Sequence, residues 1–143
     1  MVARNLIFWP VIVLMAMALA TYVYLFRTRV RESRAGHVNR ERWRLHDDAW
    51  PDNVVQISNN LRNQFEMPVL FYGACFMLWA LEGVGIVALV TAWLFVLIRI
   101  AHAWVHLTSN RMRHRAPVFA ASWWVMVFLL LLVAWRLAGR ALI

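Results

Sequence analysis

Long apolar runs dominate the chain, and four of them are long enough to cross a bilayer as helices. We expect spans at about residues 6–26, 61–81, 84–104 and 118–135, because a crossing helix needs about 20 mostly apolar residues. Helices satisfy their backbone hydrogen bonds within one segment, as lipid requires. The pattern predicts an all-α, integral membrane four-helix bundle, with residues 1–143 forming one transmembrane domain.

Composition supports lipid as the solvent of these runs. The chain is 63% hydrophobic and 15% charged, whereas soluble domains contain about 45–50% apolar and about 25% charged residues. All 15 basic residues are arginine, and the formal charge is +8. The arginines flank the apolar runs, where such residues act as topology signals and headgroup contacts. No nucleic-acid-binding motif is present, so we expect membrane lipid as a partner and no nucleic acid.

The distribution of arginine predicts the orientation of the spans. The polar loop over residues 27–60 carries seven arginines, and the loop after the third span adds Arg111, Arg113 and Arg115. The opposite side has three, Arg4, Arg136 and Arg140. Cytoplasmic loops carry the excess of basic residues, so this ratio of ten to three places both loops in the cytoplasm and both termini outside it. The arginines after the first span also favour a retained anchor over a cleaved signal peptide.

A short turn at Glu82-Gly83 joins the second and third spans as an antiparallel hairpin. Residues whose numbers sum to about 165 should then lie at similar depth, which makes Glu66 level with Arg99. The same rule gives two further pairs, Asn63 with His102 and Asn59 with His106.

Helical spacing groups these polar residues into two stripes that can face each other. The stripe on the second span is Asn59, Asn63 and Glu66, with Arg62 one turn before Glu66, and the stripe on the third is Arg99, His102 and His106. Ionisable groups inside a membrane are costly unless paired or hydrated, so they are functional candidates. An ion pair that only fastens the two helices is the alternative. The number of polar groups favours a polar cavity open to the cytoplasm.

The same residues raise the question of a metal site. His102 and His106 have the i, i+4 spacing of zinc ligands. Glu66 is the only candidate for a third ligand, and no cysteine cluster completes the set. We expect no metal.

Two short motifs resemble the MAPEG family, the membrane-associated proteins in eicosanoid and glutathione metabolism. Arg62 precedes Asn63-Gln64-Phe65-Glu66, which resembles the family's Asn-x-x-Glu signature, and Arg99-Ile100-Ala101-His102 is similar to its Arg-x-x-His stretch. Length, span number and loop sizes match as well. The resemblance is to a bacterial-type member, which implies the inner membrane as the location.

The resemblance implies a homotrimer with a glutathione site between neighbouring subunits, near the cytoplasmic face. Glutathione would be the co-substrate. The implied binding residues are Asn59, Arg62, Asn63, Glu66, Arg99, His102 and His106, and the implied thiolate-stabilising residue is Arg113 or Arg115. Two positions depart from the pattern, because many enzymatic members carry an arginine where Asn59 stands and a tyrosine where His106 stands.

Three functions follow as hypotheses. The first is a glutathione- or thiol-dependent transferase or peroxidase acting on lipophilic substrates. The second, motivated by the two departures, is a non-catalytic membrane protein of the same fold that binds lipid or a partner protein. The third is a proton-linked carrier, which the lack of a polar path to the far face disfavours.

Overall fold

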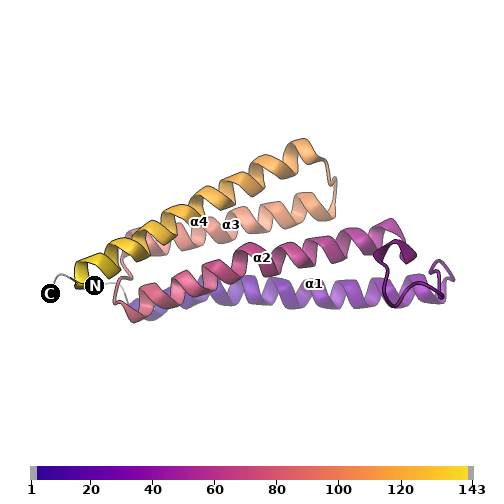
Figure 1. Ribbon diagram of the computed structural model, residues 1–143, viewed down its shortest axis with the longest axis horizontal. Helices are drawn as coiled ribbons and strands as arrows, with labels where there is room; N and C mark the ends of the chain where they lie inside the picture. Colours follow the sequence, from indigo (N-terminus) through magenta and orange to yellow (C-terminus); the bar gives the residue numbers. More distant parts are fainter. Residues whose placement is uncertain (1–2, 142–143) are drawn as a thin grey trace.

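The computed structural model describes residues 3–141, and over that range it is entirely helical apart from turns and loops. The elements are η1 (Arg4–Ile7), α1 (Phe8–Arg34), η2 (Asp47–Ala49), α2 (Asp52–Ala80), α3 (Ile86–Leu107) and α4 (Met112–Ala141). Figure 1 shows α1 antiparallel to α2 and α3 antiparallel to α4, with both termini at one end of the molecule. The two connections at the opposite end, residues 35–51 and 108–111, form what we call the loop end.

The expected four-helix architecture is confirmed, and three of the helices are apolar enough to cross a membrane. Among the described residues these are the stretches Arg4–Arg34, Ile86–Leu107 and Met112–Gly139. The polar residues Asn63, Gln64 and Glu66 interrupt the apolar run of α2. The chain is therefore an integral membrane protein, and crossing by α2 stays a prediction.

A shared apolar core joins η1 and all four long helices. Phe71 of α2 and Phe95 of α3 are fully buried, and their rings stack with centroids 4.6 Å apart. Leu14 of α1 and Leu129 of α4 pack into the same core. Large apolar side chains also cover the outer surface, for example Leu97, which is 61% exposed. Such a surface needs lipid or a neighbouring chain to cover it.

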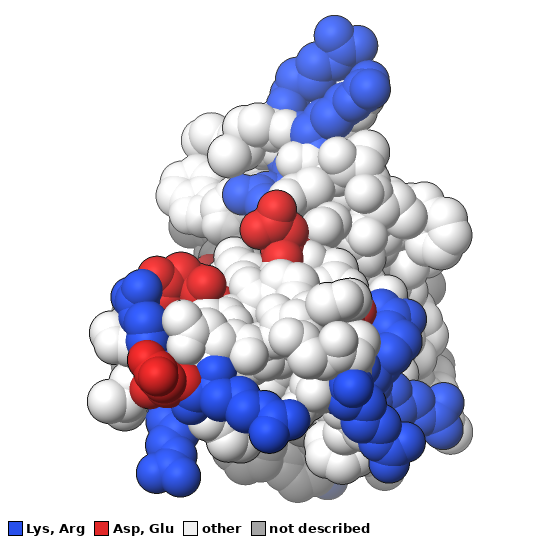
Figure 2. All heavy atoms as spheres, turned by 90° about the vertical axis from the view of Figure 1, so that its right-hand side faces the viewer, with Lys and Arg blue, Asp and Glu red and all other residues white. Residues whose placement is uncertain are grey.

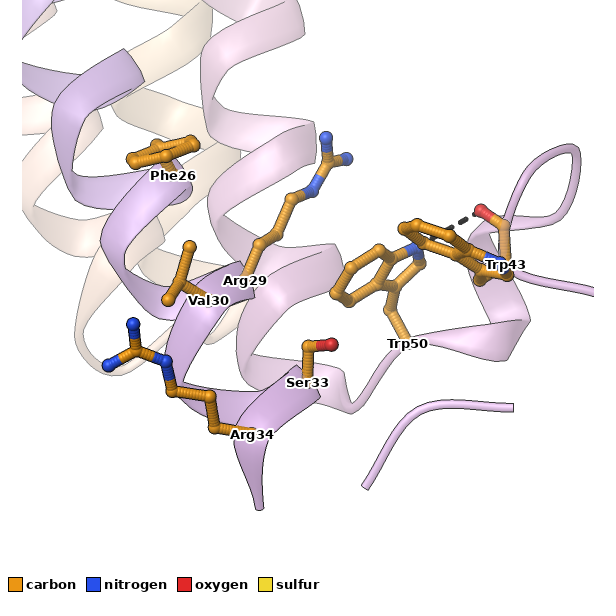
Figure 3. A pocket seen from close by; sticks show the side chains of 7 residues that line it. All are labelled: Phe26, Arg29, Val30, Ser33, Arg34, Trp43 and Trp50. Carbon is orange, nitrogen blue, oxygen red and sulfur yellow. Dashed lines mark hydrogen bonds between the residues drawn. The ribbon is translucent and has the colours of Figure 1, made fainter. Parts of the chain in front are cut away.

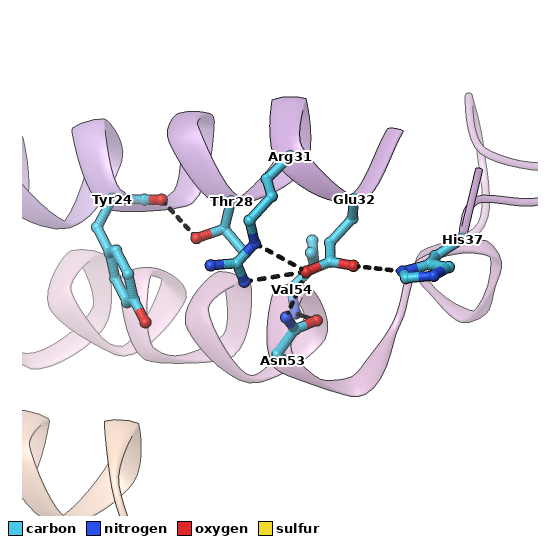
Figure 4. A network of polar contacts seen from close by, with 7 residues as sticks. All are labelled: Tyr24, Thr28, Arg31, Glu32, His37, Asn53 and Val54. Atoms are coloured by element: carbon cyan, nitrogen blue, oxygen red, sulfur yellow. Dashed lines mark hydrogen bonds and ion pairs between the residues drawn. The ribbon is translucent and has the colours of Figure 1, made fainter. Parts of the chain in front are cut away.

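Helix α1 continues beyond the expected end of the first span at residue 26 and reaches Arg34, where it anchors the connection to α2. The carboxylate of Glu32 accepts hydrogen bonds from Arg31, from His37 at 2.8 Å and from Asn53 of α2 at 2.9 Å (Figure 4). Glu32 is only 7% exposed. Because charge-assisted hydrogen bonds are the stronger ones, this carboxylate fixes where the polar connection leaves α1 and where α2 begins.

The start of α4 differs from the sequence interpretation. We expected Arg113, His114 and Arg115 in a loop, but α4 begins at Met112 and its first turn contains all three. Their side chains are therefore carried by a rigid element. Figure 2, which views the loop end, shows arginine around the tip of the α3–α4 pair and around the α1–α2 connection.

Candidate functional site

Two hydrogen bonds fix the register of α2 against α3. Gln56 donates from Nε2 to the backbone carbonyl of His106 at 2.6 Å, and Asn60 donates from Nδ2 to the carbonyl of Ala103 at 3.3 Å. These residue numbers sum to 162 and 163 instead of about 165. The connection between the helices spans residues 81–85, which is longer than the two-residue turn that the sequence suggested. The hairpin therefore forms, but the predicted depth pairs are displaced by two to three residues.

Arg99 lies level with Asn63, where the sequence predicted Glu66. Its side chain is 1% exposed, and Nη2 donates to the backbone carbonyl of Asn63 at 2.6 Å. Nε and Nη1 are buried and have no hydrogen-bond partner among the described residues. Leaving buried donors of a charged group without partners is costly. The guanidinium therefore offers two donors that an anionic ligand can satisfy.

Glu66 and Arg62 lie on the outward face of α2, and both are exposed. Glu66 interacts electrostatically with Arg99, so its charge reaches the buried guanidinium. Arg62 is ion-paired with Asp47 of η2 and also donates to the side chain of Asn59 at 3.4 Å. The structure therefore places Arg62 with the α1–α2 connection, away from Arg99.

The two histidines face α4. His102 and His106 are each 2% exposed, and their ring centroids lie 5.8 Å apart. Nη1 of Arg115 lies 3.0 Å from Nε2 of His106 and donates to Asn110 Oδ1 at 2.8 Å. A guanidinium can only donate, so Nε2 of His106 accepts and the ring proton is on Nδ1. This nitrogen is buried and without a partner among the described residues.

A pocket of about 250 Å³ opens where α2, α3 and the start of α4 meet. It is lined by Asn63, His102, Met112, Arg115, Ala116 and Phe119. Arg113 is exposed, and its contact is with the neighbouring His114 at 3.3 Å. The two candidate catalytic arginines thus differ, because Arg115 is held by the fold and Arg113 is free to reach a bound molecule.

The donors of Arg99 that have no partner among the described residues suit an anion, and the neighbouring pocket carries one further cation, Arg115. Asn63, Arg99, His102, His106 and Arg115 come together between α2, α3 and α4, whereas Arg62 and Glu66 line the outer face of α2. Asn59 lies between the two groups, since its backbone carbonyl accepts from Asn63 at 2.9 Å. Within residues 3–141, no three His, Cys, Asp or Glu side chains gather closely enough to hold a metal ion.

Sequence reasoning missed a row of buried amides on α2. Gln64 and Asn60 are 2% and 1% exposed, and Gln64 Nε2 donates to Asn60 Oδ1 at 2.7 Å and to Thr21 Oγ1 of α1 at 2.9 Å. Gln56, Asn60 and Gln64 repeat at i, i+4 and i+8 and therefore share one helical face. That regular spacing was the available signal, and this face, not the Asn59–Glu66 stripe, is the one that packs on α1 and α3.

Comparison with known proteins gives one finding. The family model of the MAPEG family matches residues 6–135, which is nearly the whole chain. Comparisons with curated proteins and with solved structures returned no match. The matched segment contains both motifs, 63–66 on α2 and 99–102 on α3, that the hairpin brings together. With its helical membrane architecture and this match, the chain belongs to the MAPEG family.

Proposed function

We propose that the protein is a thiol-dependent transferase or peroxidase that uses glutathione and acts on lipophilic electrophiles. The observation that carries the proposal is the buried guanidinium of Arg99. Its Nε and Nη1 have no hydrogen-bond partner among the described residues, and the charge of Glu66 acts on it. His102, three residues further along α3, lines the pocket together with Arg115. A small peptide with carboxylates and one ammonium group matches that distribution of charge.

Each residue of the site has its own part in binding glutathione in this proposal. Arg99 donates a charge-assisted hydrogen bond to a carboxylate from Nε or Nη1, the two nitrogens without a partner among the described residues. Glu66 accepts from the ammonium group, and Asn63 orients the peptide backbone. Asn59, His102 and His106 shape the remaining wall, with Arg62 positioned by Asp47 at its outer edge. The loop end faces the cytoplasm, where glutathione would enter.

The site requires neighbouring chains in this proposal. Glu66 and Phe65 are exposed on the outer face of α2, and Phe65 is 50% exposed. An exposed carboxylate beside apolar side chains is costly in lipid, and a second subunit would cover it. We therefore propose a homotrimer with the thiol site between subunits, in the bacterial inner membrane and with both termini outside the cytoplasm.

Arg113 is the proposed activating residue. A nearby guanidinium favours the thiolate, which is the nucleophilic form of a thiol. In a transferase reaction the thiolate sulphur bonds to the electrophilic carbon, the leaving group departs with the electron pair of the broken bond, and the thiol proton passes to solvent. In a peroxidase reaction the thiolate attacks an oxygen of a lipid hydroperoxide, the O–O bond breaks to release the alcohol, and a second glutathione converts the sulphenic acid to the disulphide and water. The lipophilic partner would enter from the bilayer, next to the apolar side chains of Met112 and Phe119 at the pocket.

Calorimetry of the detergent-purified protein with glutathione tests the proposal. We expect saturable binding that Arg99→Ala reduces by at least about tenfold, because hydrogen bonds to charged groups are worth about 1.5–3 kcal/mol. Arg40→Ala, an exposed arginine in the α1–α2 connection, is the matched control and should bind as the wild type. No binding by folded wild-type protein would overturn the proposal and favour the non-catalytic alternative.

A further inference from the structure

A second pocket, of about 420 Å³, lies where α1 leaves its apolar segment. Its walls come from the end of α1 and from the connection to α2, and no described residue of α3 or α4 is among those that line it. Figure 3 shows Phe26, Val30 and Arg34 following one edge along α1, with Arg29 and the rings of Trp43 and Trp50 on the other side. None of these residues takes part in the thiol site proposed above.

The lining changes from apolar to basic along α1. Phe26, Val30 and Arg34 are spaced i, i+4 and i+8, so they form one stripe on the helix. Phe26 is 68% exposed and ends the apolar segment, whereas Arg34 ends the helix. At one helical rise per residue, the stripe covers about 12 Å. This is the polarity profile of a bilayer from its acyl region to its headgroups.

The two tryptophans form the other wall and brace Arg29. Their rings meet edge to face with centroids 6.0 Å apart, and Trp50 Nε1 donates to the carbonyl of Trp43 at 3.4 Å. The Cζ atom of Arg29 lies 5.2 Å from the centroid of the Trp50 ring. Stacking on an aromatic face holds a guanidinium in one place. Tryptophan is also the residue typical of the membrane interface.

Within residues 3–141, two arginines and no acidic residue line this pocket. Glu32, Asp47 and Asp48 are ion-paired with Arg31, Arg62 and Arg42, respectively. Among the described residues, Arg29 and Arg34 form no ion pair, and Nε of Arg29 is buried without a hydrogen-bond partner. A second hollow of about 380 Å³ shares Arg29 and both tryptophans and extends to Arg44 and to Asp47, the partner of Arg62. The site thus has guanidinium groups that form no ion pair among the described residues, next to a largely apolar wall.

We propose that this pocket binds the phosphate of an anionic phospholipid from the leaflet at the loop end. Arg29 donates to the phosphate oxygens, Arg34 lies at the mouth on the water side, and the acyl chains run along the exposed face that contains Phe26. A free phosphate would gain nothing from the apolar wall, whereas a phospholipid uses both parts of the pocket. Basic residues next to a span also attract anionic lipid through the surface potential of the membrane.

The test is native mass spectrometry of the full-length protein in detergent, titrated with short-chain phosphatidylglycerol, phosphatidylcholine or glycerol phosphate. We expect phosphatidylglycerol to bind about tenfold more tightly than phosphatidylcholine, and Arg29→Ala to remove that preference. Arg27→Ala is the matched control, because Arg27 is exposed on the same helix and outside the pocket. It should bind as the wild type.

A second variant keeps the test decisive if Arg29→Ala does not fold. Ser33→Phe fills the pocket and leaves every arginine in place, so we expect the same loss of preference. Equal weakening by Arg29→Ala and Arg27→Ala, or wild-type binding by Ser33→Phe, would overturn the proposal. Competition by glycerol phosphate at the same concentration as phosphatidylglycerol would overturn the phospholipid as occupant. The lipid-binding results do not depend on whether the protein binds glutathione, because the lipid pocket and the proposed thiol site share no residue.

Discussion

Arg99 of α3 donates a 2.6 Å hydrogen bond to the backbone carbonyl oxygen of Asn63 in α2. This contact joins the Asn-x-x-Glu and Arg-x-x-His motifs across the hairpin and uses one of the three guanidinium nitrogens. The other two remain buried and without partners among the described residues. The fold therefore orients the guanidinium while leaving most of its donors available, which is the geometry of a binding residue more than of a fastener.

The buried amide row should contribute to stability. Asn60→Ala removes the bond to the Ala103 carbonyl and the acceptor for Gln64. We expect a loss of about 1 kcal/mol, in the range measured for interhelical hydrogen bonds in membranes. Thermal unfolding in detergent, followed by circular dichroism, measures it. Asn59→Ala is the control, because among the described residues that side chain accepts only the 3.4 Å contact from exposed Arg62. An equal loss of stability in both variants would contradict the stabilising role of the buried amides.

Glu66 should recognise the ammonium group of glutathione. The wild type should bind glutathione about tenfold more tightly than N-acetylglutathione, which lacks that charge. Glu66→Gln should bind both ligands equally weakly, since the carboxylate is gone. Calorimetry with the four combinations gives the coupling between the two groups. If Glu66→Gln still binds glutathione more tightly than N-acetylglutathione, Glu66 does not recognise the ammonium group.

The two candidate catalytic arginines should respond differently to removal. Arg113→Ala should lower turnover with an electrophilic substrate by about 100-fold, the lower end of the range for losing one donor to a developing charge. It should also reduce the ultraviolet absorbance of bound thiolate. Its unfolding temperature should be unchanged, because Arg113 is exposed. Arg115→Ala should lower the unfolding temperature, because Arg115 bonds His106 and Asn110. If Arg115→Ala lowers turnover and Arg113→Ala lowers the unfolding temperature, Arg115 is the activating residue and Arg113 the structural one.

The orientation predicted from arginine can be tested with one engineered thiol. Cys75 is the single cysteine and is fully buried, so Cys75→Ala gives a thiol-free background. Leu45→Cys then places a thiol at a side chain that is 89% exposed in the α1–α2 connection. A membrane-impermeant maleimide should label it only after spheroplasts are lysed. Labelling of intact spheroplasts would show that the α1–α2 connection lies outside the cytoplasm, opposite to the predicted orientation.

The sequence was sufficient for the helical architecture and for the family. Apolar runs, arginine asymmetry and i, i+4 spacing are local properties, so they can be recognised in the sequence without any tertiary contact. They predicted four helices and the hairpin of α2 with α3, both of which the structure confirms. Trimer assembly, glutathione binding and the orientation remain predictions.

Only the tertiary structure decided which face of α2 turns inward and how far it slides along α3. Two polar stripes were present on that helix, and the buried one is Gln56, Asn60 and Gln64, because their amides reach partners on α1 and α3. The rotation leaves Glu66 exposed and brings Asn63, not Glu66, level with Arg99. Register and rotation depend on the summed packing of several helices, such as the stacking of Phe71 on Phe95. A periodic pattern identifies the candidate faces of one helix, but it does not decide which of them packs against the neighbouring helices.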